Sequence, residues 1–408
     1  MLARQSHCRT AQYAIRAVET GQSCIRKEKA LSATPTYVAL GIWPVTTSGR
    51  AKFCPALIME DREVRIQTLS VGGYRTTVRS VGSEGEAVVL VHGMISSSYI
   101  YEGLLQKLPG KYRAVAMDLR GHGDSECADY DATRGLRDFA EDISDLMVAF
   151  AISQAHLVGH SLGGGVAMQF ALLYPHQVLS LTLEATMSPF GQYCTKDKQG
   201  TPCWPDYAGS GCGFPNPAFL AAMQSRDMSL DNPFSQPNAW RRVVVKPPFT
   251  LPPDVEEKMC QESFKCCKSA DFFPGDVQMS DNWPGYRPGV KGVLNAVSPA
   301  YCNLAAFVDI QPKPPVLWVR GDSDCIVNDK APGDPGSLGA AGVIMNWPGE
   351  GVFPAQPMVK QIRNVLKGYE KLGGTYKEVV LPDCAHAPHI EKAAQFLAEL
   401  VTFLANIA

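Results

Sequence analysis

A serine, Ser161, stands two positions after Gly159 and two positions before Gly163. An apolar stretch over 155–159 precedes it and an amphipathic stretch over 162–174 follows it, which predicts a sharp turn between a strand and a helix. Small flanking residues suit such a strained turn, because its neighbours pack closely. The free N–H groups at the start of the helix would face negative charge that develops beside the serine. This pattern predicts a nucleophilic serine.

Two glycine-rich segments precede the serine turn. Residues 92–94 read His-Gly-Met after an apolar stretch, and residues 118–125 carry the pattern D-x-x-G-x-G-x-S after the next one. Together with the serine turn, these segments have the order and spacing of the α/β-hydrolase fold superfamily. The chain resembles that superfamily over residues 63–186 and 313–407, and the resemblance implies a serine hydrolase with a large lid insertion.

The resemblance also implies the parts of a catalytic site. Ser161 would be the nucleophile, and the backbone N–H groups of Met94 and Leu162 would form the oxyanion hole. The base would be His386, in a segment that resembles the family's G-H-x-P pattern with Ala385 in place of glycine. A serine hydroxyl activated by histidine performs acyl transfer through an acyl-enzyme.

Two carboxylates compete for the role of orienting the histidine. Asp324 follows a strand in a segment that resembles the family's G-x-x-D pattern, with Asp322 as a turn-capping residue. Glu184, at the end of an earlier strand, is the alternative acid, because some members of the family carry the acid there. His389 is the fallback for the base. The remaining histidines near the motifs, at positions 92, 122 and 160, are interpreted as structural.

The elements that must position these residues alternate along the chain. Apolar strands are predicted at 87–91, 112–117, 155–159, 178–183, 316–319 and 376–381. Helices are predicted at 98–108, 135–152, 162–174, 358–372 and 391–405. Apolar strands separated by helices indicate an α/β protein with a mostly parallel central sheet that helices cover on both faces. A hairpin at 64–79 would add an antiparallel edge.

One long segment interrupts this alternation. The predicted core is formed by residues 59–186 and 306–408, and the insertion 187–305 holds 15 of the 30 prolines and 15 of the 36 aromatic residues. Because it begins at the carboxyl end of a strand, where ligands bind in such sheets, it is predicted to be a lid over the site. The alternative is an accessory domain with its own core.

The first 58 residues differ from the rest. They contain eight Arg or Lys residues against Glu19 and Glu28, and they show no sustained period. Such a basic leader is typical of an organelle-targeting peptide, but a disordered tail or translated sequence ahead of a start at Met59 would look the same. A cytoplasmic location is expected, with organelle targeting or secretion as alternatives.

Composition excludes several classes of function. A net charge of −2 gives no field that would collect nucleic acid, and no apolar run is long enough to span a membrane. The 13 cysteines lack zinc-ligand spacing, so mostly free thiols and no metal or cofactor are expected. The expected partner is a small molecule.

These observations favour hydrolysis of a carboxylic ester or lactone of a moderately large apolar substrate. A carbon–carbon bond or amide hydrolase of the same fold is an alternative, because fold and catalytic residues do not fix the substrate. A non-catalytic ligand receptor that retains the fold is the alternative from another class.

Overall fold

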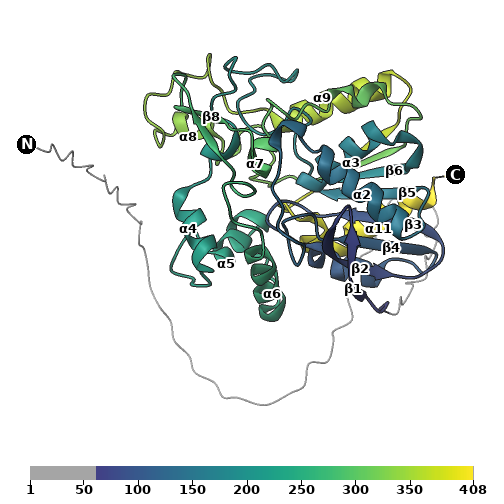
Figure 1. Ribbon diagram of the computed structural model, residues 1–408. Helices are drawn as coiled ribbons and strands as arrows, with labels where there is room; N and C mark the ends of the chain where they lie inside the picture. Colours follow the sequence, from purple (N-terminus) through teal and green to yellow (C-terminus); the bar gives the residue numbers. More distant parts are fainter. Residues whose placement is uncertain (1–60, 408) are drawn as a thin grey trace, which may run out of the picture. The chain divides into compact units, whose positions relative to one another are not determined.

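The structure is a computed structural model that describes residues 61–407. Its centre is a sheet of eight strands (Figure 1). The strands are β1 (Arg65–Val71), β2 (Tyr74–Val81), β3 (Glu86–Val91), β4 (Tyr112–Met117), β5 (Ala155–His160), β6 (Val178–Glu184), β9 (Val316–Gly321) and β10 (Tyr376–Leu381). The predicted leader, residues 1–58, and the candidate start at Met59 lie outside the described residues.

The strand order explains where the site is built. It runs β1-β2-β4-β3-β5-β6-β9-β10, with β1–β2 and β2–β4 antiparallel and every later pair parallel. The predicted mostly parallel sheet with an antiparallel edge is therefore confirmed. The carboxyl ends of the parallel strands meet at one edge of such a sheet, so the loops that follow them lie close together.

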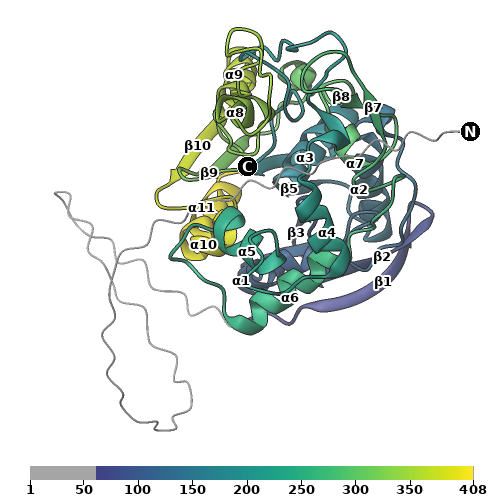
Figure 2. The same ribbon diagram turned by 90° about the vertical axis from the view of Figure 1, so that its left-hand side faces the viewer.

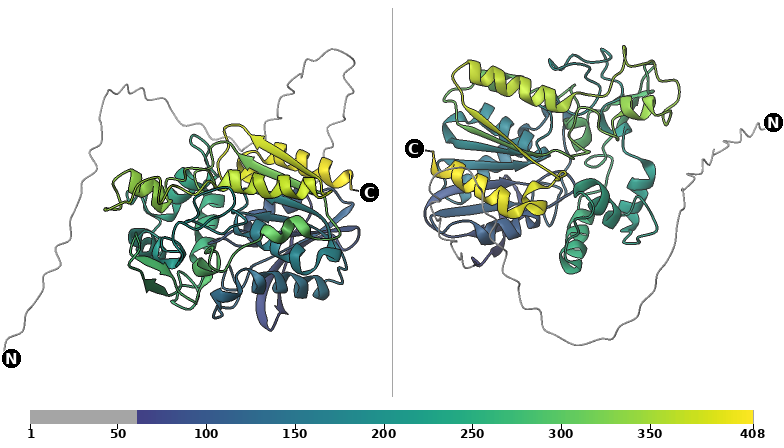
Figure 3. Two further views of the ribbon diagram at one scale, coloured as in Figure 1. Left: turned by 90° about the horizontal axis from the view of Figure 1, so that it is seen from above. Right: turned by 180° about the vertical axis from the view of Figure 1, so that it is seen from behind.

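Helices cover both faces of the sheet, as predicted. They are α1 (Glu102–Lys107), α2 (Arg137–Ala149), α3 (Leu162–Leu173), α9 (Met358–Lys371) and α11 (Ala393–Ala405). Successive strand residues point to opposite faces. Residues of α2, α3 and α9 share one buried apolar cluster, and residues of α1 and α11 share another. Figures 2 and 3 show α9 and α11 on opposite sides of β9 and β10. Within 61–407, no helix has the length and apolar character needed to cross a bilayer.

The segment between β6 and β9 adds short elements near the carboxyl ends of the strands (Figure 1). They include α4 (Pro217–Ser225), α5 (Gln236–Ala239), the π-helical turn η5 (Trp240–Val244), α6 (Pro253–Phe264), the hairpin of β7 (Val277–Met279) and β8 (Tyr286–Pro288), and α7 (Val293–Ala296). Phe264 of this segment is buried in the same cluster as residues of α1, and Leu294 is buried with residues of α2 and α3. The segment thus shares the two apolar clusters of the sheet.

A disulfide also links this segment to the sheet domain. Cys127, in the loop after β4, is bonded to Cys267, just after α6, across 140 positions of sequence. The backbone N–H of Cys267 also donates to the carbonyl of Gly121 at 2.8 Å. The other eight cysteines among the described residues are free, and seven of them are buried. The spacing of the cysteines gave no signal for this bond, because its partners meet only after the chain folds.

Candidate active site

Ser161 occupies the turn between β5 and α3 with φ 56° and ψ −117°. A residue other than glycine rarely adopts positive φ, and it persists there only where the surroundings hold it. Here the N–H of Ser161 donates to the carbonyl of Glu184 on β6 at 2.9 Å. Its own carbonyl accepts from Gly164 at 3.0 Å and from Met187 at 3.2 Å. The neighbouring strand and the first turn of the helix therefore fix the serine in its strained conformation.

The two glycines beside the serine are required by close backbone contacts. A Cβ atom at Gly159 would lie 2.2 Å from the carbonyl oxygen of Gly163. One at Gly163 would lie 2.0 Å from the carbonyl oxygen of Val91 on β3. Because both neighbours are backbone atoms, no side-chain rotation could relieve either clash. The glycine spacing seen in the sequence is thus a packing requirement of this turn.

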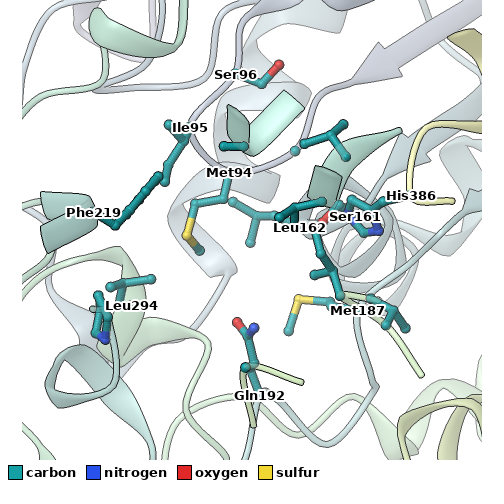
Figure 4. A pocket seen from close by; sticks show the side chains of 18 of the residues that line it. Met94, Ile95, Ser96, Ser161, Leu162, Met187, Gln192, Phe219, Leu294 and His386 are labelled. Carbon is teal, nitrogen blue, oxygen red and sulfur yellow. The ribbon is translucent and has the colours of Figure 1, made fainter. Parts of the chain in front are cut away.

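His386 and Asp324 form a buried pair at the same edge of the sheet. The Nδ1 atom of His386 lies 2.8 Å from Oδ2 of Asp324. The other carboxylate oxygen of Asp324 accepts from the backbone N–H groups of Ile326 at 2.8 Å and Val327 at 2.9 Å. Figure 4 shows Ser161 and His386 side by side at the wall of a pocket. Three loops, after β5, β9 and β10, thus bring the three predicted residues together.

The alternative acid and the fallback base pair with each other instead. Oε1 of Glu184 accepts from both the backbone N–H and Nδ1 of His389, each at 2.7 Å. Burial would raise the pKa of the Glu184 carboxyl, but the adjacent His389 outweighs burial and holds that pKa below its ordinary value. Neither side chain is among the described residues that line the pocket, whereas His386 is.

The predicted oxyanion donors lie at the pocket beside the serine. No acceptor within 61–407 takes the backbone N–H of Met94 or of Leu162, and both residues line the pocket. The loop of Met94 passes so close to the turn that a Cβ atom at Gly93 would lie 3.1 Å from Cβ of Ser161. Two free N–H groups next to a serine suit an oxygen that gains negative charge.

His92 holds the loop that carries Met94. Its Nε2 accepts from the backbone N–H of Leu119 at 2.9 Å, which leaves the proton on Nδ1 to bind the carbonyl of Gly93 at 2.7 Å. Burial lowers the pKa of His92 to about 4, so the ring stays neutral at physiological pH. These contacts agree with the structural interpretation of this histidine.

The pocket in front of Ser161 has a volume of about 530 Å³. Its lining is mostly apolar and includes Phe214 and Trp240. Ile95, Met187, Phe219 and Leu294 also line it (Figure 4). A few amide and hydroxyl side chains, such as Gln192 and Ser188, are placed among them. Among the described lining residues there is no Asp, Glu, Lys or Arg. Such a cavity suits a sizeable uncharged ligand.

The π-helical turn η5 contacts the histidine loop directly. Trp240, Val243 and Val244 line the pocket, and the carbonyl of Val244 accepts from the backbone N–H of His386 at 3.0 Å. π-helical turns occur frequently at functional sites. Apart from the richness of residues 187–305 in aromatic side chains, no feature of the sequence indicated this contact.

Known proteins share the fold of this chain. The family model described as "alpha/beta hydrolase fold" matches residues 86–210. The esterase RhEst1 from Rhodococcus sp. ECU1013 superposes with a TM-score of 0.53 at 18% identity, over 85% of this chain and 99% of that one. At this identity the likeness concerns the fold alone.

Curated relatives match a smaller part. An uncharacterized protein of Mycobacterium tuberculosis is 41% identical over 120 residues, which are 29% of this chain and 34% of that protein. The 2-(acetamidomethylene)succinate hydrolase of Mesorhizobium japonicum is 36% identical over 115 residues, which are 28% of this chain and 40% of that protein. The chain thus spans between a third and two fifths of the length of these relatives.

Proposed function

Because this chain has the α/β-hydrolase fold, we propose that it is a serine hydrolase in which Ser161 attacks the substrate and His386 acts as the base. Asp324 orients His386, and the N–H groups of Met94 and Leu162 form the oxyanion hole. One observation carries the proposal: a serine at positive φ lies beside a histidine whose Nδ1 is 2.8 Å from a buried carboxylate (Figure 4).

The reaction follows from these positions. Oγ of Ser161 bonds to the carbonyl carbon of the substrate while its proton passes to Nε2 of His386. The carbonyl oxygen becomes an oxyanion, which accepts from the N–H groups of Met94 and Leu162. His386 then gives the proton to the leaving alkoxide, and an acyl-enzyme remains. Water repeats the sequence, which releases the acid and restores the serine. Throughout, Asp324 holds Nδ1–H and stabilises the imidazolium.

The pocket favours a neutral carboxylic ester or lactone with a sizeable apolar acyl group. A carboxylate or ammonium group buried there would lose its hydration without gaining an oppositely charged partner among the described lining residues. A substrate with a free carboxylate, of the kind that the name of the Mesorhizobium relative describes, fits this lining poorly.

Residues 187–305 are proposed to act as the lid of this pocket. Several described lining residues come from this segment, including Phe214, Phe219, Trp240 and Leu294. The segment also shares the two large buried clusters with the sheet domain, which favours a lid over an accessory domain with its own core.

Labelling with a fluorophosphonate probe tests the chemistry, and a panel of p-nitrophenyl esters of increasing acyl length tests the substrate class. We expect labelling of Ser161 and turnover of neutral esters, with much slower turnover of a hemisuccinate ester of similar size. A protein that resists the probe would be a ligand receptor. Labelling without turnover of esters or aryl lactones would contradict ester hydrolysis and favour hydrolysis of an amide or a carbon–carbon bond.

A further inference from the structure

A second histidine–carboxylate pair, Glu184 with His389, is buried behind the proposed site. The two side chains are 0% and 1% exposed. Glu184 Oε1 lies 2.7 Å from Nδ1 of His389, and Nε2 of that ring lies 3.1 Å from the carbonyl oxygen of Ile100. Both ring nitrogens thus face acceptors. A histidine ring can donate from both nitrogens only when it is protonated, so the contacts describe an ion pair.

Glu184 also touches the nucleophile turn. Its backbone carbonyl accepts the N–H of Ser161 at 2.9 Å, while its side chain binds His389, three residues beyond His386. Through Ile100, the same pair reaches a residue of the pocket wall. One buried glutamate therefore connects the turn of the proposed nucleophile, the loop of the proposed base and a wall of the pocket.

His160 adds a second connection between the same loops. Its ring packs against the rings of both His386 and His389, with centroids 4.9 and 5.4 Å away. Burial lowers the pKa of His160 to about 3, so this ring is neutral, and its Nε2 lies 2.8 Å from the carbonyl oxygen of His386. The one nitrogen-bound proton of the ring is therefore on Nε2, which donates it to the carbonyl oxygen of His386.

We propose that Glu184 and His389 form a buried ion pair that positions His386 against Ser161. This inference rests on the proposed function. The pair does not line the pocket, so it acts through the placement of the base and leaves the binding of substrate nearly unchanged. Because a displacement of about 1 Å at a catalytic group can cost 100-fold in rate, loosening this support should lower kcat and spare KM.

Three variants separate positioning from stability. Glu184→Gln leaves a buried histidine without its carboxylate, whereas the double change Glu184→Gln with His389→Gln neutralises both partners and should recover part of the lost melting temperature. His156→Asn is the matched control. His156 is another buried histidine of β5, and its Nδ1 lies 2.8 Å from the hydroxyl of Ser180.

We expect kcat to fall about tenfold or more in both Glu184 variants, with KM within about twofold and kcat unchanged in the control. A folded double variant with wild-type kcat would overturn the inference. If neither variant folds, ¹⁵N NMR of histidine in the wild-type protein decides the question. The titratable groups packed on His389 are Glu184, His160 and Tyr101, and contacts to the Tyr101 ring, 5.0 Å away, assign its signals.

Both ring nitrogens of His389 should carry protons in the folded protein, and a ring with one bare nitrogen would overturn the proposed ion pair. Fluorophosphonate labelling of the wild-type protein keeps the two proposals apart. Absence of labelling would contradict the serine hydrolase, while the NMR measurement still reports on the pair. A labelled wild type together with a fully active double variant would contradict only the positioning role.

Discussion

The backbone N–H of His386 donates to the carbonyl oxygen of Val244 at 3.0 Å. A hydrogen bond therefore joins the loop that carries the proposed base directly to the segment 187–305. The same π-helical turn places Trp240 in the pocket wall, where the side chain is almost fully buried. A change in this turn is expected to act on both the shape of the pocket and the placement of the histidine.

Trp240→Ala should therefore shift selectivity toward longer or bulkier acyl groups, because it enlarges the cavity beside Ser161. The ratio of kcat/KM for a long ester to that for a short one is the measurement, since it does not depend on the amount of folded enzyme. Trp204→Ala and Trp283→Ala are matched controls, because these rings pack around Phe353, away from the pocket lining. Equal ratios in all three variants would contradict the lid.

Ser161→Ala should abolish turnover and probe labelling while the protein stays folded, because only a hydroxyl is lost. Residual kcat of about a thousandth of the wild type or less is expected from binding and the oxyanion donors. Circular dichroism and the melting temperature check the fold. Activity well above that level would exclude Ser161 as the nucleophile.

The turn that carries the proposed nucleophile could be predicted from the sequence because its signal is local. Backbone contacts within the turn and with β3 require glycine at positions 159 and 163. Both glycines fall within the five residues 159–163, so the pattern can be recognised in the sequence. The order of strands and helices could be predicted for a similar reason. Apolar strands buried on both faces and amphipathic helices leave a periodic pattern that does not depend on distant partners.

The sequence favours Asp324 as the acid but leaves Glu184 as an alternative. Glu184 is the last residue of β6, opposite Val319 of β9, and Asp324 follows β9, so both carboxylates lie at one edge of the sheet. Which of them reaches His386 depends on the path of the loops after β9 and β10. No spacing in the sequence encodes that path. The contact of η5 with the histidine loop could not be predicted either, because it joins Val244 and His386, which are about 140 positions apart.

Asp324→Asn and Glu184→Gln test the acid directly. The first change should lower kcat by about 10⁴-fold, the scale seen when the acid of such a triad is neutralised. The second should cost far less, roughly ten- to a hundredfold, because Glu184 acts through His389. Both variants are measured on one neutral ester at one pH. The reverse ranking would assign the acid to Glu184.

Cys127→Ser should lower the free energy of unfolding by about 2–4 kcal/mol, because the bond to Cys267 closes a long loop in the unfolded chain. Chemical denaturation with and without a thiol reductant is the measurement. The reductant should destabilise the wild-type protein and leave the variant unchanged. A wild-type midpoint that does not respond to the reductant would mean that the two cysteines are not bonded.

Buried neutral histidines should make the protein sensitive to mild acid. Burial lowers the pKa of His92 to about 4, and that of His122 and His160 to about 3. Since these values lie below the ordinary pKa of 6.5, the unfolded chain binds protons that the folded protein excludes. The stabilisation that these neutral histidines provide is therefore complete above about pH 6.5. It is lost as the pH falls toward their pKa values in the folded protein.

Each histidine lowers the free energy of unfolding by about 1.4 kcal/mol per pH unit below its ordinary pKa. The three together should therefore lower it by about 4 kcal/mol between pH 8 and pH 5.5. Denaturant unfolding at several pH values measures this loss, which is large against a typical total of about 5–15 kcal/mol. His122→Asn, which can still donate to the carbonyl of Arg120, should reduce the loss by about a third. The exposed His176, changed to Asn, is the control. Equal stability at pH 8 and pH 5.5 would mean that the folded protein accommodates these rings in their charged form.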